Sequence, residues 1–319
     1  MTIQPKVGVA LLNWNGGEFT IPCIESLLAS EVKPWRIVVA DNGSTDGSAD
    51  TIAHAFPEVS VYRNECNLGF AGGTNVAVRA LLAEGADLVW ILNNDTVVDR
   101  HCLGELVLEM ERDERVAASS AKIHFESPKD LIWYAGGNWS RWTLAAPHRG
   151  EGEVDGGQYD RTEDVGFVSG CCMLARASAL RKVGLLDEAY VAYSEDADWC
   201  LRAQKAGYRL RYVPSALLWH KVSASIRKNT LGQSGGFSSP TAYYFATRNR
   251  IYVLRDHAGR PVPYLSALAA LFLRCLYLSA GFVVLRRFGK LTAMWRGARD
   301  GFRRRGGSTG VPGTPAISG

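Results

Sequence analysis

Few features of secreted, zinc-binding or repeat proteins are present in this sequence. Residues 1–6 contain neither an apolar stretch nor a cleavage-site pattern, which argues against a secretory signal. The seven cysteines are scattered, and neither Cys171 and Cys172 nor the others have the two-pair spacing of a zinc site. We therefore expect reduced, structural thiols in a cytoplasmic protein. No internal repeat appears, and low complexity is confined to residues 306–319, a Gly/Ser/Pro tail that we expect to be disordered.

Charge is modest along most of the chain and concentrated at one end. The 319 residues are 47% hydrophobic and 21% charged, as in an ordinary globular chain of one large or two moderate domains. The formal charge of +4 is local, because arginines and lysines crowd residues 286–305. This basic cluster follows an apolar segment and belongs to no recognised nucleic-acid-reading module, so we expect no nucleic-acid partner.

The first half of the chain alternates between apolar strands and helices. Repeated strand, helix, strand units imply right-handed crossovers and a mainly parallel sheet, hence an α/β fold. Asp41 and Asp95 stand at the carboxyl ends of two strands, and we expect them to face one crevice. The expected strands are 7–12, 36–40, 58–62 and 87–92, and the expected helices are 19–30, 44–56 and 72–84.

Beyond Asp95 the pattern is less regular. Residues 130–164 are rich in Gly and Trp, which favours a loop-rich wall. We expect helices at 101–112, 177–183 and 196–206, the last closed by Gly207, and strands at 116–123, 165–168, 173–175 and 208–213, the last ended by Pro214.

The strand at 87–92 stops at three short oxygen-bearing side chains, Asn93, Asn94 and Asp95, with no Lys or Arg among them. Ligands of open α/β sheets bind at the carboxyl ends of strands. The Asp95 carboxylate suits a hard cation such as Mg²⁺ or Mn²⁺, which prefers oxygen ligands and retains substrate phosphates. A plain polar turn is the alternative, because Asn and Asp are common in turns.

Two further polar loops follow strands and open helices. In residues 41–48, the strand-end position of Asp41 favours contact with ribose hydroxyls or base edges, whereas Asp46 suits ligand contact and helix capping equally well. In residues 67–75, glycines allow close backbone approach, and Asn75 lies near a helix start. This second loop is neither a Walker loop nor a Rossmann fingerprint, and a helix-entry turn without ligand contacts is its alternative.

Glu195 and Asp196 begin an expected helix. Adjacent acids raise each other's proton affinity while the helix dipole lowers it, so one of them is suited to accept a hydroxyl proton. Dipole pairing with a Ser194 cap is the structural alternative. His220 follows the last expected strand, where its imidazole suits either a metal shell or simple packing.

In their order, these sites resemble those of family 2 glycosyltransferases of the inverting, GT-A type, near the bacterial rhamnosyltransferase-like branch. The resemblance covers residues 7–250. It implies the nucleotide-diphospho-sugar transferase fold, with a mostly parallel central sheet, flanking helices and a C-terminal helical extension. The implied division is a catalytic domain at 1–222, a helical and membrane-associating region at 223–305, and the tail at 306–319.

The resemblance also assigns roles to residues. Asn93-Asn94-Asp95 takes the place of the Asp-x-Asp metal motif, His220 matches a histidine that helps to hold the metal, and Asp196 of the Glu195-Asp196 pair matches the general base. Asn93 departs from the motif's first Asp, which removes a negative charge and leaves most of the metal binding to Asp95. The residues expected to contact the nucleotide sugar are Asn13, Trp14, Asp41, Asp46, Asn67, Gly69, Asn75 and Asn94.

The implied reaction is metal-dependent, inverting transfer of a sugar from a nucleotide-diphosphate sugar to a saccharide or lipid-linked saccharide in polysaccharide, glycoconjugate or cell-wall synthesis. Mn²⁺ or Mg²⁺ is the implied cofactor. A sugar nucleotidyltransferase would need a basic Gly-rich loop after the first strand, and residues 13–17 contain no cation. A noncatalytic nucleotide-sugar binding protein would explain Asn93 but would not require Glu195-Asp196. The sequence does not identify the sugar.

Residues 264–285 are twenty-two residues with one charge, Arg274, a length that suits a bilayer. Attachment at the membrane interface, a buried packing helix and a membrane span are the three alternatives. Arg274 makes a span costly, and the basic cluster that follows suits anionic lipid headgroups. The sequence therefore favours peripheral contact with the cytoplasmic face of the membrane.

Overall fold

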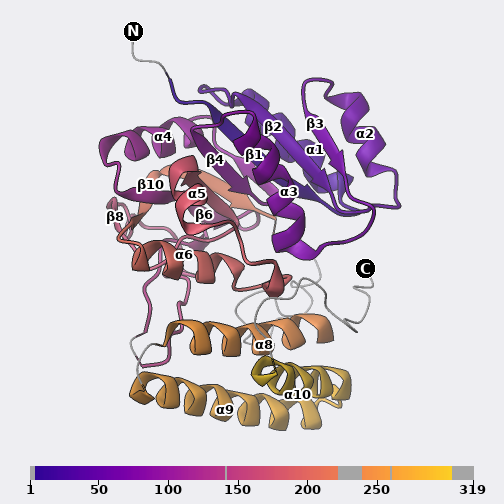
Figure 1. Cartoon of the computed structure of the whole chain (residues 1–319), viewed down its shortest axis with the longest axis vertical. Helices are drawn as coiled ribbons and strands as arrows, with labels where there is room; N and C mark the ends of the chain where they lie inside the picture. The colour runs from indigo at the N-terminus through magenta and orange to yellow at the C-terminus, as the bar shows by residue number, and fades with distance from the viewer. Residues whose placement is uncertain (1–3, 141, 222–238, 259–260, 304–319) are drawn as a thin grey trace.

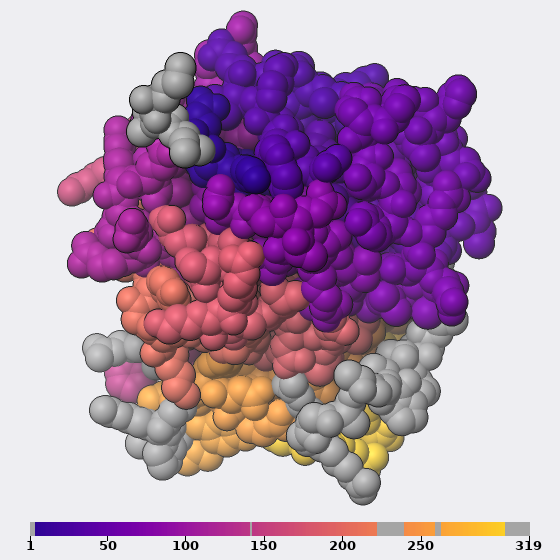
Figure 2. Space-filling model, turned by 45° about the horizontal axis from the view of Figure 1, so that its top comes forward, coloured from indigo at the N-terminus to yellow at the C-terminus, as the bar shows by residue number. Residues whose placement is uncertain are grey.

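The computed structural model describes residues 4–140, 142–221, 239–258 and 261–303. Among these residues, ten strands form one sheet that helices flank, and three C-terminal helices lie in a layer beneath the sheet-bearing body (Figure 1). In the space-filling view the same layer, orange to yellow, borders the pink part of the chain (Figure 2). The expected tail at 306–319 lies outside the described residues, as do residues 222–238.

The first four long strands are parallel, in the order β3-β2-β1-β4. The apolar side chains of β1, β2 and β4 are buried because helices cover the sheet, as the continuous apolar runs predict, whereas Tyr62 of the edge strand β3 is 40% exposed. The strand expectations for this half are thus confirmed. The elements are β1 (Val7–Asn13), α1 (Gly17–Ala29), β2 (Arg36–Asp41), α2 (Ser48–Ala55), β3 (Ser60–Arg63), α3 (Gly69–Ala83) and β4 (Leu88–Leu92).

The second half makes the sheet mixed. β9 pairs antiparallel with both β4 and β6, while β10 runs parallel to β6. Cys172 pairs with Leu92, so β9 starts at the carboxyl end of β4 and runs back along it. The elements are β5 (Thr96–Val98), α4 (Cys102–Arg112), β6 (Val116–Phe125), β7 (Ile132–Tyr134), β8 (Glu163–Asp164), β9 (Cys172–Arg176), α5 (Ala177–Val183), η1 (Glu188–Tyr190), α6 (Glu195–Lys205) and β10 (Arg209–His220).

Two expectations for this half are wrong. Residues 165–168 are not a strand, because Gly166 donates its backbone N–H to Gly137 O and is wedged against the backbone of Asn138. Pro214 does not end β10, which continues to His220. The register of β10 against β6 shifts between Val213 and Leu217, and such a bulge accommodates a residue without an N–H.

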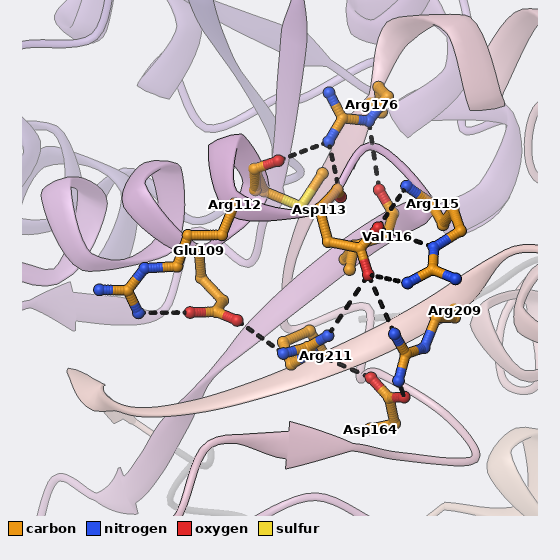
Figure 3. A network of polar contacts seen from close by, with 10 residues as sticks. Glu109, Arg112, Asp113, Arg115, Val116, Asp164, Arg176, Arg209 and Arg211 are labelled. Atoms are coloured by element: carbon orange, nitrogen blue, oxygen red, sulfur yellow. Dashed lines mark hydrogen bonds and ion pairs between the residues drawn. The ribbon is translucent and has the colours of Figure 1, made fainter.

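The amino ends of β6 and β10 are joined by a network of charges (Figure 3). Arg211 bonds to Glu109 at 2.7 Å, and Arg209 bonds to Asp113 at 3.0 Å. The side-chain hydrogen bond from Arg115, with its backbone N–H next, holds the pKa of Asp113 well below its usual range. Ion pairs therefore link the elements at this end of the sheet.

The C-terminal layer consists of three helices. Gly297 of α10 lies so close to α8 that a Cβ there would stand 2.3 Å from Tyr244 O. The expected helix at 264–285 is confirmed as α9, and among the described residues only 17% of its most apolar stretch is buried, which disfavours the buried packing helix. By length and composition α9 is able to cross a membrane. The three helices are α8 (Pro240–His257), α9 (Pro261–Val284) and α10 (Phe288–Phe302).

Candidate active site

Asp41 is the last residue of β2 and is almost fully buried, at 3% exposure. Its Oδ1 accepts hydrogen bonds from Asn13 Nδ2 at 2.8 Å and from Ser44 Oγ at 2.6 Å, and its Oδ2 accepts from Ser44 N at 3.0 Å. Asn13, which ends β1 and is fully buried, also donates to Ser48 Oγ at 2.8 Å. The charge of Asp41 thus organises the loop before any ligand arrives.

Hydrogen bonds between side chains connect this loop to the end of β4. Thr20 Oγ1 donates to Asn13 Oδ1 at 2.8 Å, and Asn94 Nδ2 donates to Thr20 Oγ1 at 2.7 Å. Asp41, Asn13 and Asn94 are therefore members of one chain of contacts across the ends of β2, β1 and β4. The structure brings these three predicted site residues together.

Asp46 is exposed and forms a local turn at the entrance to α2. Its Oδ1 accepts from Ser48 N at 2.9 Å and from Ser48 Oγ, and the second of these bonds is the larger cause of its lowered pKa. The helix begins at Ser48 rather than at residue 44, because Gly47 adopts φ 77° before it. Trp14 is half-buried and directly precedes Asn15, which lines a shallow groove. This groove of about 290 Å³ is lined by Asn15, Gly17, Glu18, Ile21, Asp46, Ser48 and Thr51.

The Gly-rich loop begins α3 earlier than expected. Asn67 Oδ1 accepts from Gly69 N at 2.8 Å and from Asn42 Nδ2 at 2.8 Å. Gly69 has φ +76°, and a Cβ there would stand 2.7 Å from Val191 O, so a larger residue would be strained and crowded. Asn75 lies within α3, buried, and its Nδ2 donates to Leu186 O at 2.8 Å.

The metal motif follows β4. His220 Nε2 lies 3.1 Å from Asp95 Oδ1, and Asn93 Oδ1 is buried without a hydrogen-bond partner. Adjacent ligand atoms about 2.1 Å from one octahedral cation are about 3 Å apart, so the Asp95 and His220 atoms are spaced as two ligands of one ion would be. Within the described residues, no group of three or more His, Cys, Asp or Glu side chains is suited to hold a metal. The donor set fits a cation with few protein ligands.

The acidic pair begins α6 as expected. Glu195 is buried, and its Oε2 has no hydrogen-bond partner. Burial, and next the neighbouring Asp196 carboxylate, raise the pKa of Glu195 to about 8. Burial also raises the pKa of Asp196, against two bonds that favour its carboxylate: Gly170 N donates to Oδ2 at 2.8 Å, and Ala197 N donates to Oδ1 at 2.7 Å. Asp196 is the more accessible of the two.

One short segment joins the acidic pair to the metal motif. Gly170 N donates to Asp196 Oδ2, and the next residue, Cys171, accepts at its carbonyl from Asn93 N at 3.0 Å. Asp196 and Asn93 are therefore held on either side of a single peptide segment. Sequence reasoning missed Gly170, because nothing in its local pattern shows that β9 would lie beside β4.

The turn before α6 has an unusual backbone. Val191, Tyr193 and Ser194 have φ values of 66°, 69° and 71°, a region that residues with a Cβ seldom adopt. Ala71 N, at the start of α3, donates to Val191 O at 3.1 Å. Sequence reasoning also missed this turn, since none of its residues is a glycine.

Comparisons with known proteins bear on this arrangement. The family model "Glycosyl transferase family 2" matches residues 9–184. The chain is 28% identical over 267 residues to the N-acetylglucosaminyl-diphospho-decaprenol L-rhamnosyltransferase of Mycobacterium tuberculosis, covering 76% of this chain and 84% of that protein.

Solved structures are similar in fold. S. aureus TarS 1–349 in complex with UDP-GlcNAc superposes with a TM-score of 0.60 and 14% identity, covering 93% of this chain and 81% of that one. GalNAc-T7 with UDP, GalNAc and Mn²⁺ superposes with a TM-score of 0.59 and 14% identity, covering 80% of this chain and 48% of that one. At these identities the likeness shows a common fold.

Proposed function

Because the chain belongs to glycosyl transferase family 2 and is a glycosyltransferase of the GT-A fold, we propose that it transfers a sugar from a nucleoside-diphosphate sugar to a saccharide or lipid-linked saccharide with inversion. The observation that carries the proposal is the segment Gly170-Cys171, which holds Asp196 on one side and Asn93 on the other. A base and a diphosphate site must flank one sugar for a single displacement to occur.

Asp196 is the proposed general base. It takes the proton of the acceptor hydroxyl as the acceptor oxygen bonds to the anomeric carbon and the nucleoside diphosphate departs with the electrons of the broken bond. The amides of Gly170 and Ala197 fix its orientation, and burial brings its pKa closer to neutrality, which suits a base. Burial, and next the neighbouring Asp196 carboxylate, raise the pKa of Glu195, which disfavours a second negative charge beside the base.

Asn93, Asp95 and His220 would hold a divalent cation, Mn²⁺ or Mg²⁺. Such an ion supplies positive charge against the departing diphosphate. Its use is supported by the crystal structure of GalNAc-T7, which has the same fold and contains Mn²⁺ with UDP. The orphaned oxygen of Asn93 supports it independently.

We place the nucleotide at the loops that follow β1, β2 and β3. Asp46 lines the groove, and we propose direct contacts for it and for Trp14, Asn67, Gly69 and Asn94. Asp41, Asn13 and Asn75 are buried and hydrogen-bonded within the protein. We therefore propose that they position the loops of the site and do not contact the nucleotide directly. The mycobacterial relative's name points to rhamnose and the TarS complex to N-acetylglucosamine.

Within the helical region at 223–305 that follows the catalytic domain at 1–222, we propose that α9 and α10 contact the membrane. The described part of α9 exposes a row of large apolar side chains, and exposed arginines follow it, at residue 286 and along α10. A helix of this kind lies at the interface with anionic lipids on the cytoplasmic face, where a lipid-linked acceptor would be found. The exposed apolar side chains are Leu265, Phe272, Leu273, Leu276, Tyr277, Val283 and Val284.

A donor panel tests the reaction. The chain is incubated with dTDP-rhamnose, UDP-N-acetylglucosamine and other nucleotide sugars, with Mn²⁺ or with EDTA, and a membrane extract as acceptor source. Release of nucleoside diphosphate, with the opposite anomeric configuration in the product by NMR, is expected; release of pyrophosphate would instead indicate nucleotidyl transfer, the alternative reaction. Flotation with vesicles of phosphatidylglycerol tests the membrane contact, and failure to float would remove it.

A further inference from the structure

We propose that Arg248 and Asn249, in the middle of α8, are positioning residues that hold Asp196 in place through the turn before α6. Both lie outside residues 9–184, which the family model matches. Both are buried, at 3% and 0% exposure, in a helix that contributes no residue to the site described above. The inference rests on the proposed function, because the role of Asp196 belongs to it.

The turn at residues 191–194 requires contacts from outside its own segment. Val191, Tyr193 and Ser194 all adopt positive φ, and such a backbone persists in residues with a Cβ when its surroundings fix it. Ala71 N bonds to one of its carbonyls, but Ser194 makes no side-chain cap for α6. The remaining carbonyls point toward α8.

Asn249 meets those carbonyls with its amide group. Its Oδ1 accepts from Arg248 Nε at 2.9 Å, which fixes the amide so that its NH₂ faces the turn. Arg248 adds donors of its own, and within the described residues no carboxylate lies within ion-pair distance of its guanidinium. Asn249 Nδ2 donates to Tyr190 O at 2.9 Å, Ala192 O at 2.7 Å and Tyr193 O at 2.7 Å, and Arg248 donates to Ala189 O and Tyr190 O, each at 2.8 Å.

The same helix also holds the segment beyond the acidic pair. His257 Nε2, at the end of α8, lies 2.8 Å from Asp198 Oδ1, and Asp198 N in turn donates to Ser194 O at 2.9 Å. Residues of α8 therefore bond to the chain both before and after Glu195 and Asp196. A displacement of the turn moves the first turn of α6, and with it the bond from Gly170 N to Asp196 Oδ2.

Asn249→Asp tests this role, because it keeps the shape of the side chain and turns its NH₂ donor into an acceptor facing three carbonyls. Tyr244→Phe is the matched control: it removes a partly buried bond from the same helix, to Asp300 Oδ2 at 3.2 Å in α10, and keeps the ring beside the Arg248 guanidinium. Rates are measured by nucleoside diphosphate release with dTDP-rhamnose or UDP-N-acetylglucosamine, whichever the wild-type chain uses. We expect kcat to fall about 100-fold in Asn249→Asp, as for a misplaced catalytic group, with donor KM and the control's kcat changed less than threefold.

A double-mutant cycle separates positioning from general support of the fold. If Asn249 acts through Asp196, then Asn249→Asp lowers the residual rate of Asp196→Asn by less than about twofold. A further large loss on that background, or a kcat in Asn249→Asp equal to that of Tyr244→Phe, would overturn the proposal.

Hydrogen exchange keeps the test independent of the assay. In Asn249→Ala, which avoids the repulsion of Asp and serves if Asn249→Asp does not fold, exchange of the amides of residues 191, 192 and 198 should rise at least about tenfold, because each depends on the turn. Unchanged exchange there overturns the inference. If the wild-type chain transfers no sugar while exchange responds as expected, the proposed function fails and the hold on the turn stands.

Discussion

Acidic residues lie at both ends of the sheet, but their pKa values are shifted in opposite directions. At the amino ends of β6 and β10, Asp113 meets Arg115 and Arg209, and its pKa is lowered (Figure 3). At the carboxyl ends, Glu195 and Asp196 lie side by side, and burial raises both pKa values. At the amino ends the charges are paired within the protein, although Arg211 Nε makes an ion pair without a hydrogen bond. At the carboxyl ends, oxygens of Asn93 and Glu195 have no hydrogen-bond partner.

The difference separates stability from chemistry. Paired charges stabilise the charged form and resist titration, whereas a buried, unpaired acid is poised to exchange a proton near neutral pH. The polar groups of the carboxyl end are suited to a ligand that brings the missing donors and charges. Changes at the two ends should therefore affect different measurements.

The largest expected effect is on turnover. Asp196→Asn removes the proposed base and should lower kcat by at least about 1,000-fold, within the range for general base catalysis. Donor affinity, measured by calorimetry, should stay nearly intact, because the variant keeps the shape of the side chain. Substantial residual turnover would remove Asp196 from its role.

Asp95→Ala should act on binding. It removes the carboxylate beside His220, and donor affinity in the presence of Mn²⁺ should fall by roughly two orders of magnitude, to the value measured in EDTA. Asn93→Asp is the matched opposite, which adds a second carboxylate and should tighten Mn²⁺ binding. Equal donor affinity with and without Mn²⁺ in the wild-type chain would contradict both expectations.

The raised pKa of Glu195 predicts a pH dependence of stability. Because the folded pKa, about 8, exceeds the ordinary 4.5, the contribution of this acid to stability is complete below pH 4.5 and is lost as pH rises through 8. Glu195→Gln cannot ionise, so it should lose less stability between pH 5 and pH 9 than the wild-type chain, by on the order of 2 kcal/mol. Urea unfolding at the two pH values measures the difference, and parallel losses in the two proteins would contradict it.

At the amino end, Arg211→Ala should affect stability without affecting transfer. It leaves the buried Glu109 carboxylate without its 2.7 Å partner from β10, which should lower the free energy of unfolding by about 2 kcal/mol. Urea unfolding measures this loss, and kcat should stay within twofold of the wild-type value. A fall in kcat at full folding would mean that the two ends are coupled.

The smallest effect is expected for Arg115→Ala in the same network. Although Arg115 is the largest cause of the low pKa of Asp113, its side chain is 73% exposed, and solvent screens the pair. The urea midpoint should not change measurably. A clear destabilisation would show that the network at this end acts as a unit rather than as separate pairs.

The fold was largely predictable from the sequence. The family, the GT-A fold and the strands of the first half are confirmed, because apolar runs alternating with amphipathic helices are local signals. The strand at 165–168 and the end of β10 at Pro214 were wrong, because each depends on a neighbouring segment rather than on its own residues. The short strands β5, β7 and β8 were missed for the same reason.

The candidate site was predictable in part. Asp41, Asp95 and Asp196 stand at element ends, where a sequence pattern is informative, and their roles stay predictions. Gly170 and Asn249 were not found, because their partners lie 26 and 56–59 residues away. Arg248 and Asn249 belong to a polar run, residues 247–250, in a helix that also contains Arg255, Asp256 and His257, so nothing in the local sequence distinguishes them.

Because α8 is stacked between α6 and α9, it sets the distance between the acidic pair and α9 (Figure 1). Packed helices lie about 8–10 Å apart, so with α9 at the bilayer surface the acidic pair stands more than one helix spacing above the lipid headgroups. Under the proposed membrane contact, the C-terminal layer would therefore set the distance from the headgroups at which an acceptor hydroxyl meets Asp196.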